Sequence, residues 1–457
     1  MKKMVRLFIA IILLIVGSLA CSTQGTTPNS NLVNDLATAV SVTLTALAQP
    51  QVSTAAGSTE VVPTVTQNVP LEPAILQVAY IKNLNAYIWT ETEGTLQLTT
   101  SGDVRDVKIS NDGQLVALTR NPASFSEEIW AVNNDGSNLR LLISSAELLA
   151  TYSGTEADRP SGIGVYQFGW QPGTHNLYYN TRPLFEGPGF GSFDDLYMVN
   201  ADSLTKTTLF PAHSGGKFFF SPDGNKMAIV TPTSISLVNA DGSNLHSNVL
   251  TFTAVITYSE YSYYPRPVWA PDSSGLRVVV PPGDPMLSPL PPSNLWYLPA
   301  DGSVPVSSGG ILALSFKWPD YAISSDLNRV GYASPVGVPS ANLRDIHVAN
   351  ADTSGDAVFI GGEQASFEGW LPDSIQFVFE VNSGPSKGVH VGTVGGGYVT
   401  LFTDPVPINR ISWPDSTHFL YFFQNAGITE LRYNNFGAGG GSVLLDTGDI
   451  SSYDYSN

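Results

Sequence analysis

The sequence predicts an all-β protein, a β-propeller of eight four-stranded blades, and three observations lead to this prediction. Short apolar runs with the two-residue alternation of strands are separated by Asp-Gly turns along most of the chain. This layout repeats about every 40 to 50 residues, as blades do because each buries its two faces only against its neighbours. Gly and Pro occur 42 and 32 times, and only 13% of the residues are charged, which is typical of a turn-rich protein.

The clearest repeat unit spans residues 107–143. It contains four apolar runs, VKIS, LVALT, EIWAV and LRLLI, with tight Asp-Gly turns at 112–113 and 135–136 and one longer loop. This pattern predicts one four-stranded antiparallel sheet. The same layout returns at 218–250 and 268–306 and, in looser form, from Phe168, Tyr321, Phe367 and Ile411.

The two ends of the folded part complement each other. The runs LQVAYIKN, AYIWTET and TLQLTT, from Leu76 on, predict three strands with no innermost strand before them. Residues 449–456 predict one isolated strand, which would complete this blade and close the ring without a free edge. The other repeats begin near residues 104, 166, 217, 267, 321, 366 and 410. Eight blades follow from this count, with seven as the alternative, because the copies at 313–360 and 409–447 are the most degraded.

Residues 1–21 have the pattern of a bacterial export signal. A basic start precedes an apolar run, 7–16, that is too short to span a bilayer comfortably. The ending GSLAC at 17–21 resembles the lipobox of bacterial lipoproteins, although Ser18 stands where that family usually has Leu. The resemblance implies that Cys21, the single cysteine of the chain, is acylated and anchors the protein to the membrane. An ordinary secretory signal is the alternative.

Residues 22–75 are predicted to be a flexible tether. They are rich in Ser, Thr, Ala, Gln and Pro, and 22–74 contain no aromatic residue, Lys or Arg, so the segment has little to bury. Within it, 31–48 has helical periodicity and predicts a short transient helix. The propeller domain then covers 76–457.

The repeat at 218–250 resembles the TolB-type propeller repeat. Its SPDG turn at 221–224 is followed by MAIV and then by ISLVNADGSN. Variants of the turn occur as SNDG at 110–113, APDS at 270–273, WLPD at 370–373 and WPD at 413–415. The resemblance covers roughly 77–456 and implies a propeller fold. It implies no single function, since such repeats occur in periplasmic TolB, in prolyl oligopeptidase-like peptidases and in many envelope proteins.

Loop lengths predict which face of the ring binds a ligand. Turns after the first and third strands of a blade share one face, and these are the tight Asp-Gly turns. Connections after the second and fourth strands share the opposite face, and functional residues concentrate on such long loops. The long connections are 119–128, 144–165, 181–194, 252–265, 281–293, 308–320 and 334–344.

Two of these connections supply the candidate binding residues. They are Tyr258, Tyr261, Tyr263 and Tyr264 in one connection, and Arg182, Phe185, Phe190 and Phe193 in the other. Tyrosine combines rigid apolar area with a hydrogen-bonding tip, which suits contacts with sugars, peptides and proteins. The alternative is that two or three of the tyrosines pack on neighbouring loops. The apolar, Pro-rich connection 281–292 suggests either a protein partner or a lid over a blade edge.

No catalytic residue, metal site or cofactor is assigned. No G-x-S-x-G nucleophile elbow, H-E-x-x-H metal motif or phosphate-binding G-x-x-x-x-G-K is assigned, and the six histidines are dispersed. A structural Ca²⁺ in the central channel is the one cofactor alternative. The acidic pairs at 127–128 and 194–195 begin third strands on the long-loop face, so a polysaccharide hydrolase or lyase is the alternative function. Adjacent strand residues point to opposite sides, however, so each pair places at most one carboxylate inward.

The formal net charge of -18 opposes nucleic-acid binding, which needs Lys and Arg to displace phosphate counterions. The sequence as a whole therefore predicts a monomeric, extracytoplasmic propeller that is held to the bacterial membrane by a lipid anchor only. Its predicted role is non-catalytic binding or scaffolding in the cell envelope, with an envelope protein or a glycan as partner.

Overall fold

The structure, a computed structural model, describes residues 75–186, 191–313, 321–337, 342–403, 408–436 and 442–456. The chain divides into two compact units, Met1–Val69 and Pro70–Asn457, and every described residue belongs to the second. The predicted signal with Cys21 and the predicted tether helix lie outside the described residues. No helix within the described ranges is long and apolar enough to cross a membrane.

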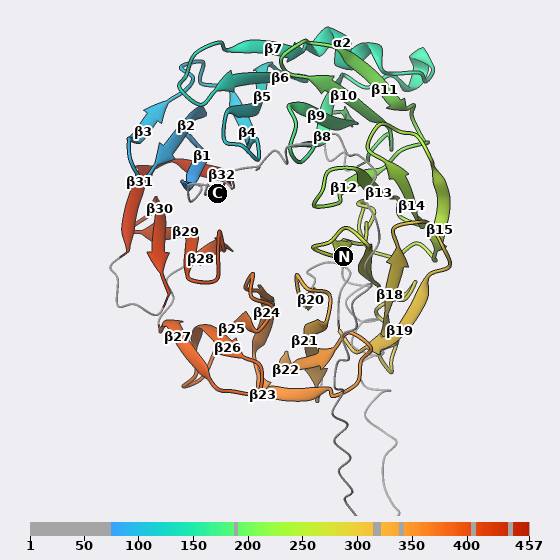
Figure 1. Cartoon of the computed structure of the whole chain (residues 1–457), viewed down its shortest axis with the longest axis vertical. Helices are drawn as coiled ribbons and strands as arrows, with labels where there is room; N and C mark the ends of the chain where they lie inside the picture. Colours follow the sequence, from blue (N-terminus) through green and yellow to red (C-terminus); the bar gives the residue numbers. More distant parts are fainter. Residues whose placement is uncertain are drawn as a thin grey trace, which may run out of the picture. The chain divides into compact units, whose positions relative to one another are not determined.

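The second unit is an all-β propeller, in which eight four-stranded antiparallel sheets follow one another around a ring (Figure 1). Blade 1 consists of β32 (Ile450–Ser456), β1 (Gln77–Lys82), β2 (Asn85–Thr90) and β3 (Gly94–Gln97), and blade 2 of β4 (Val104–Ile109), β5 (Leu115–Ala123), β6 (Ser126–Asn133) and β7 (Arg140–Ile143). Blade 3 consists of β8 (Gly162–Trp170), β9 (Asn176–Leu184), β10 (Leu196–Asn200) and β11 (Lys206–Phe210), and blade 4 of β12 (Lys217–Phe220), β13 (Lys226–Val230), β14 (Ser234–Asn239) and β15 (His246–Thr251). Blade 5 consists of β16 (Val268–Trp269), β17 (Gly275–Val280), β18 (Ser293–Pro299) and β19 (Val306–Ile311), and blade 6 of β20 (Tyr321–Ile323), β21 (Arg329–Val336), β22 (Leu343–Asn350) and β23 (Ala357–Glu363). Blade 7 consists of β24 (Ala365–Trp370), β25 (Gln376–Val381), β26 (Gly388–Thr393) and β27 (Tyr398–Phe402), and blade 8 of β28 (Ile408–Ser412), β29 (His418–Asn425), β30 (Ile428–Asn435) and β31 (Val443–Gly448).

The ring closes as predicted, with eight blades rather than seven. The C-terminal strand β32 is the innermost strand of blade 1 and pairs antiparallel with β1, so that Tyr453 lies opposite Tyr80. Figure 1 shows the red β32 beside the blue β1. The buried Tyr453 also donates hydrogen bonds to blade 8, to Ser412 Oγ at 3.0 Å and to the carbonyl of Leu420 at 3.2 Å. The backbone of β32 therefore joins the last strand to the start of the propeller, and the side chain of Tyr453 joins it to the last blade.

The Ser-Pro-Asp-Gly turn of blade 4 has two structural roles. Within the turn, Ser221 Oγ donates to Asp223 Oδ1 at 2.6 Å and accepts from the amide of Lys226 at 3.0 Å. Gly224 has a φ of +70°, and a Cβ there would lie 2.5 Å from the carbonyl oxygen of Pro172 in blade 3. Only glycine combines this backbone conformation with such a close approach. The motif therefore ends the inner strand and brings neighbouring blades together.

Tryptophans at the ends of three inner strands form a repeated link between blades. Trp170, Trp269 and Trp370 each donate an indole Nε1 hydrogen bond to a carbonyl in the inner strand of the preceding blade. The acceptors are Lys108, Phe219 and Ala322, at 3.0, 2.9 and 2.9 Å. The apolar core lies between the same elements, since the buried clusters combine residues of adjacent blades. Burying one such large side chain contributes about 1.5 to 3 kcal/mol.

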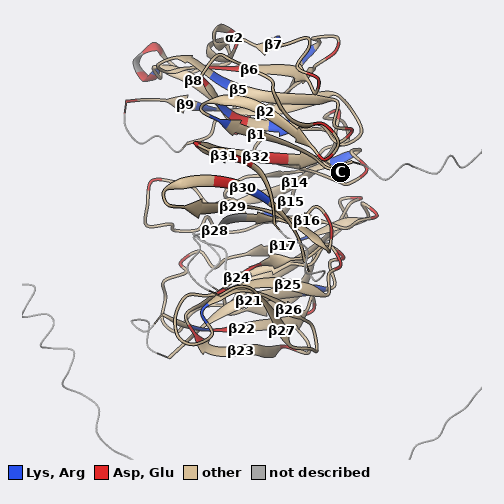
Figure 2. Cartoon of the chain, turned by 90° about the vertical axis from the view of Figure 1, so that its left-hand side faces the viewer, with Lys and Arg blue, Asp and Glu red and all other residues tan. Residues whose placement is uncertain are grey.

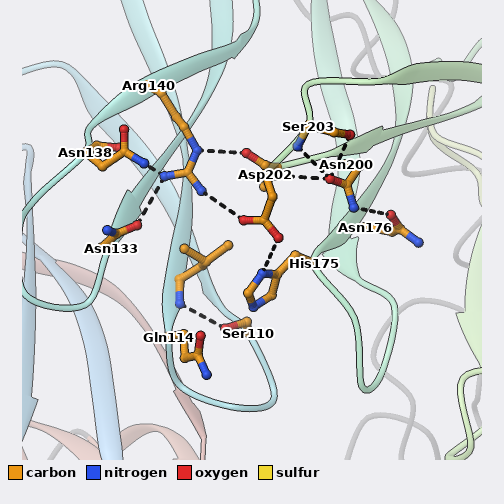
Figure 3. A network of polar contacts seen from close by, with 12 residues as sticks. Ser110, Gln114, Asn133, Asn138, Arg140, His175, Asn176, Asn200, Asp202 and Ser203 are labelled. Carbon is orange, nitrogen blue, oxygen red and sulfur yellow. Dashed lines mark hydrogen bonds and ion pairs between the residues drawn. The ribbon is translucent and has the colours of Figure 1, made fainter.

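A charged network connects blades 2 and 3 on the face that carries the tight turns (Figure 3). Arg140 Nε donates to the carbonyl of Ala201 at 2.8 Å, and its Nη2 lies 3.7 Å from Asp202 Oδ1. His175 lies between two carboxylates, with Nδ1 2.7 Å from Asp202 Oδ2 and Nε2 3.0 Å from Asp112 Oδ2. Burial acts to lower the pKa of His175, but these carboxylates outweigh it and raise that pKa. The interaction therefore favours a protonated, structural histidine.

The connection after β7 contains a short helix that sequence analysis did not predict. Helix α2 (Ser145–Ala150) is followed by the 3-10 turn η1 (Glu156–Asp158). Ser144 and Glu147 form a capping box, in which each side chain accepts a hydrogen bond from the backbone amide of the other. Glu147 also pairs with Lys206 of β11, and this hydrogen bond lowers the pKa of Glu147 to about 2.

The connection predicted at 119–128 is shorter than expected. Strands β5 and β6 continue to pair until Ala123 lies opposite Ser126, so that only a tight turn separates them. The two strands extend this far because the backbone N–H and C=O groups at their ends pair with each other. The long connections on this face therefore belong mainly to other blades.

Candidate functional site

The tyrosine-rich connection between β15 and β16 is folded onto its neighbours. The hydroxyl of Thr257 donates to the carbonyl of Tyr261 at 2.7 Å, which closes a tight loop. Tyr258 projects from this loop with 64% of its surface exposed. Its hydroxyl donates to Asp284 Oδ1 at 2.8 Å, in the Pro-rich connection between β17 and β18. The tyrosine-rich connection and the Pro-rich connection therefore touch each other.

The other three tyrosines are less exposed. Tyr263 is buried, with its hydroxyl 3.4 Å from that of Tyr321 in blade 6. Tyr264 is also buried and donates to Asp194 Oδ1 at 3.0 Å, in the connection between β9 and β10. The hydroxyl oxygen of Tyr261 is buried and has no hydrogen-bond partner among the described residues. Two of the four tyrosines thus join neighbouring blades, whereas Tyr258 and Tyr261 retain unused contact area.

Tyr258, Tyr261 and Tyr263 line one pocket of about 390 Å³. Its remaining walls come from residues 254–263 and from Pro232 in the turn between β13 and β14. A second pocket of about 480 Å³ shares Pro232 and extends along blade 4 to Asp194 and His213. Both pockets lie beside long connections, and both have the size of a small-ligand site.

The residues predicted in the second connection are dispersed. Phe185 is 45% exposed, Phe193 packs against the core with its ring 6.0 Å from that of Tyr152, and Phe190 lies outside the described residues. Arg182 Nη2 lies 3.9 Å from Glu127 Oε2, and Arg182 Nε is buried without a hydrogen-bond partner in the described part of the chain. The structure therefore joins Arg182 to an acidic side chain rather than to the aromatic residues.

The two acidic pairs each place one carboxylate inside the protein. Asp195 is only 1% exposed and accepts hydrogen bonds from the amide of Thr181 at 2.7 Å and from its hydroxyl. Glu127 is buried and accepts from the amide of Val165 at 3.0 Å. Burial raises the pKa of both carboxyl groups. Asp194 is the member that lines a pocket, and burial raises its pKa as well.

An ammonium group held between tyrosine rings lies next to Asp194. Lys217 Nζ is 4.9 Å from the ring centroid of Tyr166 and 4.8 Å from that of Tyr264. Tyr166 lies in blade 3, Lys217 in blade 4 and Tyr264 in the connection between β15 and β16, in a domain with few Lys and Arg residues (Figure 2). Burial, together with the positive charge of Arg266, lowers the pKa of Lys217. The cation–π contacts fix the inner end of the tyrosine-rich connection.

Comparisons with known proteins show neither a family nor a function for this chain. No protein-family model matches the chain, and no curated protein matches its sequence. A eukaryotic initiation factor is a similar solved structure, with a TM-score of 0.48, 10% identity and coverage of 83% of this chain and 98% of that one. An oligogalacturonate lyase from Vibrio parahaemolyticus has a TM-score of 0.42 and 13% identity, covering 68% and 83% of the two chains. TolB from Acinetobacter baumannii has a TM-score of 0.35 and 11% identity, covering 81% and 78%. Likenesses at this level say nothing about function.

The segment GPSKG at 384–388 and the nearby His390 do not form a catalytic site. The pentapeptide GPSKG at 384–388 has the spacing of a serine-hydrolase elbow, but it connects antiparallel β25 and β26, whereas that elbow joins a strand to a helix. His390 Nε2 lies 2.8 Å from the carbonyl oxygen of Ser386 rather than from its hydroxyl. Among the described residues, no group of three or more His, Cys, Asp or Glu could hold a metal ion.

Sequence reasoning missed Lys217 and Tyr166. Both lie in inner strands, where alternation alone does not distinguish a core position from one that contacts the next blade. One feature of the sequence could have indicated the contact of Lys217 with aromatic rings. Lys217 is the first residue of an otherwise aromatic inner strand, KFFF.

Proposed function

We propose that this protein is a membrane-anchored, extracytoplasmic propeller that acts as a non-catalytic binding or scaffolding module in the bacterial cell envelope. Its ligand is an envelope protein or a glycan, bound on the face that carries the long connections. The lipid anchor is Cys21, and the tether of residues 22–75 holds the propeller away from the membrane.

The observation that carries this proposal is the tyrosine-lined pocket that the connection between β15 and β16 forms with Pro232. Tyr258 offers a mostly exposed ring whose orientation is fixed by the hydrogen bond to Asp284. Tyr261 adds a buried hydroxyl that has no partner among the described residues, so a ligand atom can satisfy it. Rigid aromatic residues with a polar tip are typical of the energetic centres of binding sites.

The binding proposal is tested with the full chain in detergent, by crosslinking in envelope extracts and by a glycan array. The double variant Tyr258→Ala, Tyr261→Ala should lose about tenfold or more in affinity for whatever the wild type captures. Tyr398→Ala, which removes a partly exposed tyrosine from the outer strand of blade 7, is the matched control. An unchanged partner set in the double variant contradicts the site, and a wild type without any partner supports a structural spacer instead.

The anchor is tested separately by metabolic labelling with a fatty acid. We expect label on the wild-type protein and none on the Cys21→Ser variant, which should also leave the membrane fraction. Labelling that persists in the variant would argue against a lipid anchor at this position.

A polysaccharide hydrolase or lyase is the second candidate function, and one observation favours it. Asp194 is a carboxyl group with a raised pKa on the wall of the 480 Å³ pocket, which is a property of catalytic acids. Turnover in a panel of glycan substrates that disappears in Asp194→Asn would promote this function over binding. Asp195→Asn is the control for folding. Asp195 is buried and accepts a hydrogen bond from Thr181, so its replacement perturbs the structure without removing the carboxyl group of Asp194.

A further inference from the structure

The junction between blades 7 and 8 lacks the indole hydrogen bond that joins blades 2 and 3, blades 4 and 5, and blades 6 and 7. Trp413 directly follows the inner strand of blade 8, as Trp170, Trp269 and Trp370 end theirs. Its indole Nε1, however, donates to no acceptor in the described part of the chain. The turn after it reads Trp-Pro-Asp, one residue shorter than the Trp-Leu-Pro-Asp turn of blade 7. A hydrogen-bond donor that is used elsewhere in the fold is therefore free at this junction.

A cavity of about 490 Å³ lies at the same junction. Three aromatic residues, Trp370, Trp413 and Tyr455, line it together with the aliphatic residues Val378, Val389 and Ile411. Ser325 and Pro372, from turns after inner strands, place it toward the face of the tight turns. The cavity is thus separate from the tyrosine-lined pocket, and its volume is in the range of small-ligand sites.

Two glutamates line this cavity from neighbouring strands. Glu368 occupies a bulge in β24, where the register with β25 shifts between Phe367 and Gly369, and a bulge turns a side chain out of the regular alternation. Ser366 Oγ donates to Glu368 Oε1 at 2.6 Å. Glu380 lies on β25, opposite Ser366, so the two carboxyl groups share one wall.

The charge of these glutamates is not balanced by a contact within the described residues. Burial and then the charge of Glu368 raise the pKa of Glu380, while Lys387 acts in the opposite direction. Among the described Lys, Arg and His side chains, none lies within 4.0 Å of either carboxylate. A cation that entered the cavity would relieve this repulsion and would be held by charge-assisted hydrogen bonds.

From this arrangement we infer that the cavity between blades 7 and 8 binds an organic cation, an alkylammonium or guanidinium group. The aromatic faces of Trp370, Trp413 and Tyr455 suit the flat or methylene part of such a ligand through cation–π contacts and stacking. Glu368 and Glu380 accept its N–H groups, and a guanidinium fork matches a carboxylate in geometry. This cavity shares no lining residue with the tyrosine-lined pocket, so the two proposals can be tested separately.

The inference is tested by calorimetric titration of the full chain in detergent with agmatine, which carries both cationic groups, and with maltose as a neutral ligand. We expect saturable binding of agmatine and none of maltose. Glu380→Gln and Glu368→Gln should each weaken agmatine binding about tenfold or more. Glu93→Gln, an exposed glutamate in blade 1 outside the cavity, should leave it unchanged.

Two results would overturn the inference. The first is agmatine binding that is absent, or equal in the wild type and both cavity variants. The second is maltose binding that is lost in Trp413→Phe, which would assign the cavity to sugars. Glu368 is exposed, so Glu368→Gln should retain the wild-type melting temperature and exclude misfolding as the cause of a loss.

Discussion

Replacing Tyr453 tests the closure of the ring directly. Tyr453 is 0% exposed, its ring lies 5.0 Å from that of Phe422, and its hydroxyl donates to Ser412 and Leu420. Tyr453→Ala removes a fully buried aromatic ring, which should lower the free energy of unfolding by about 3 to 5 kcal/mol. Tyr453→Phe keeps the ring and removes only the hydroxyl, for an expected loss of about 1 to 2 kcal/mol.

The assay is urea unfolding followed by tryptophan fluorescence and by circular dichroism. Ser451→Ala, at an exposed position of the same strand, should remain close to the wild type. A loss of 4 kcal/mol, about the centre of the expected range, is a large part of the stability of an ordinary domain. If both Tyr453 variants unfolded at the urea concentration of the wild type, β32 would contribute nothing to stability, and closure by the C-terminal strand would be wrong.

Three further predictions concern the contacts between blades. Because the native pKa of His175 is raised, its stabilisation is fully present below its ordinary pKa of about 6.5 and is lost as the pH rises through the native value. The melting temperature of His175→Gln should therefore differ more from the wild type at about pH 5.5 than at about pH 8.5, and a larger difference at the higher pH would contradict the charged network. Gly224→Ala should cost about 1 to 3 kcal/mol in urea unfolding, and clearly more than Gly173→Ala, whose φ of +72° is similar but whose Cβ would meet nothing within 4 Å. Trp170→Phe should cost about 1 kcal/mol more than Trp413→Phe, since only the former loses an indole hydrogen bond, and equal costs would remove the distinction between the two junctions.

The architecture was predictable because a propeller repeats its local chemistry. Each Asp-Gly turn fixes a hairpin, and the hairpins recur at one period, so the number of blades follows from counting. Helix α2 was not predicted, although Ser144 and Glu147 have the spacing of a capping box, because six residues are too few for a periodic signal. The hairpin at Ala123 and Ser126 was missed because its turn, at 124–125, has no Asp-Gly.

The candidate site was predictable only as a region. The sequence indicates the tyrosine-rich connection, but nothing in it distinguishes the exposed Tyr258 from the buried Tyr263 and Tyr264. That difference depends on Tyr321 and Asp194, which approach from other blades. The cavity between blades 7 and 8 could not be predicted from the sequence. It depends on a turn that is one residue shorter than its counterpart and on a bulge at Glu368.

The position of β32 has a consequence for how the protein matures in the cell. Translation proceeds from the amino terminus, so seven complete blades emerge while β1 still lacks its inner neighbour. During that interval the backbone of β1 is an open template to which a strand from another nascent chain could add. A ribosome that stalled or terminated before residue 450 would release a chain with this template permanently uncovered, and such fragments should be aggregation-prone substrates for quality-control proteases.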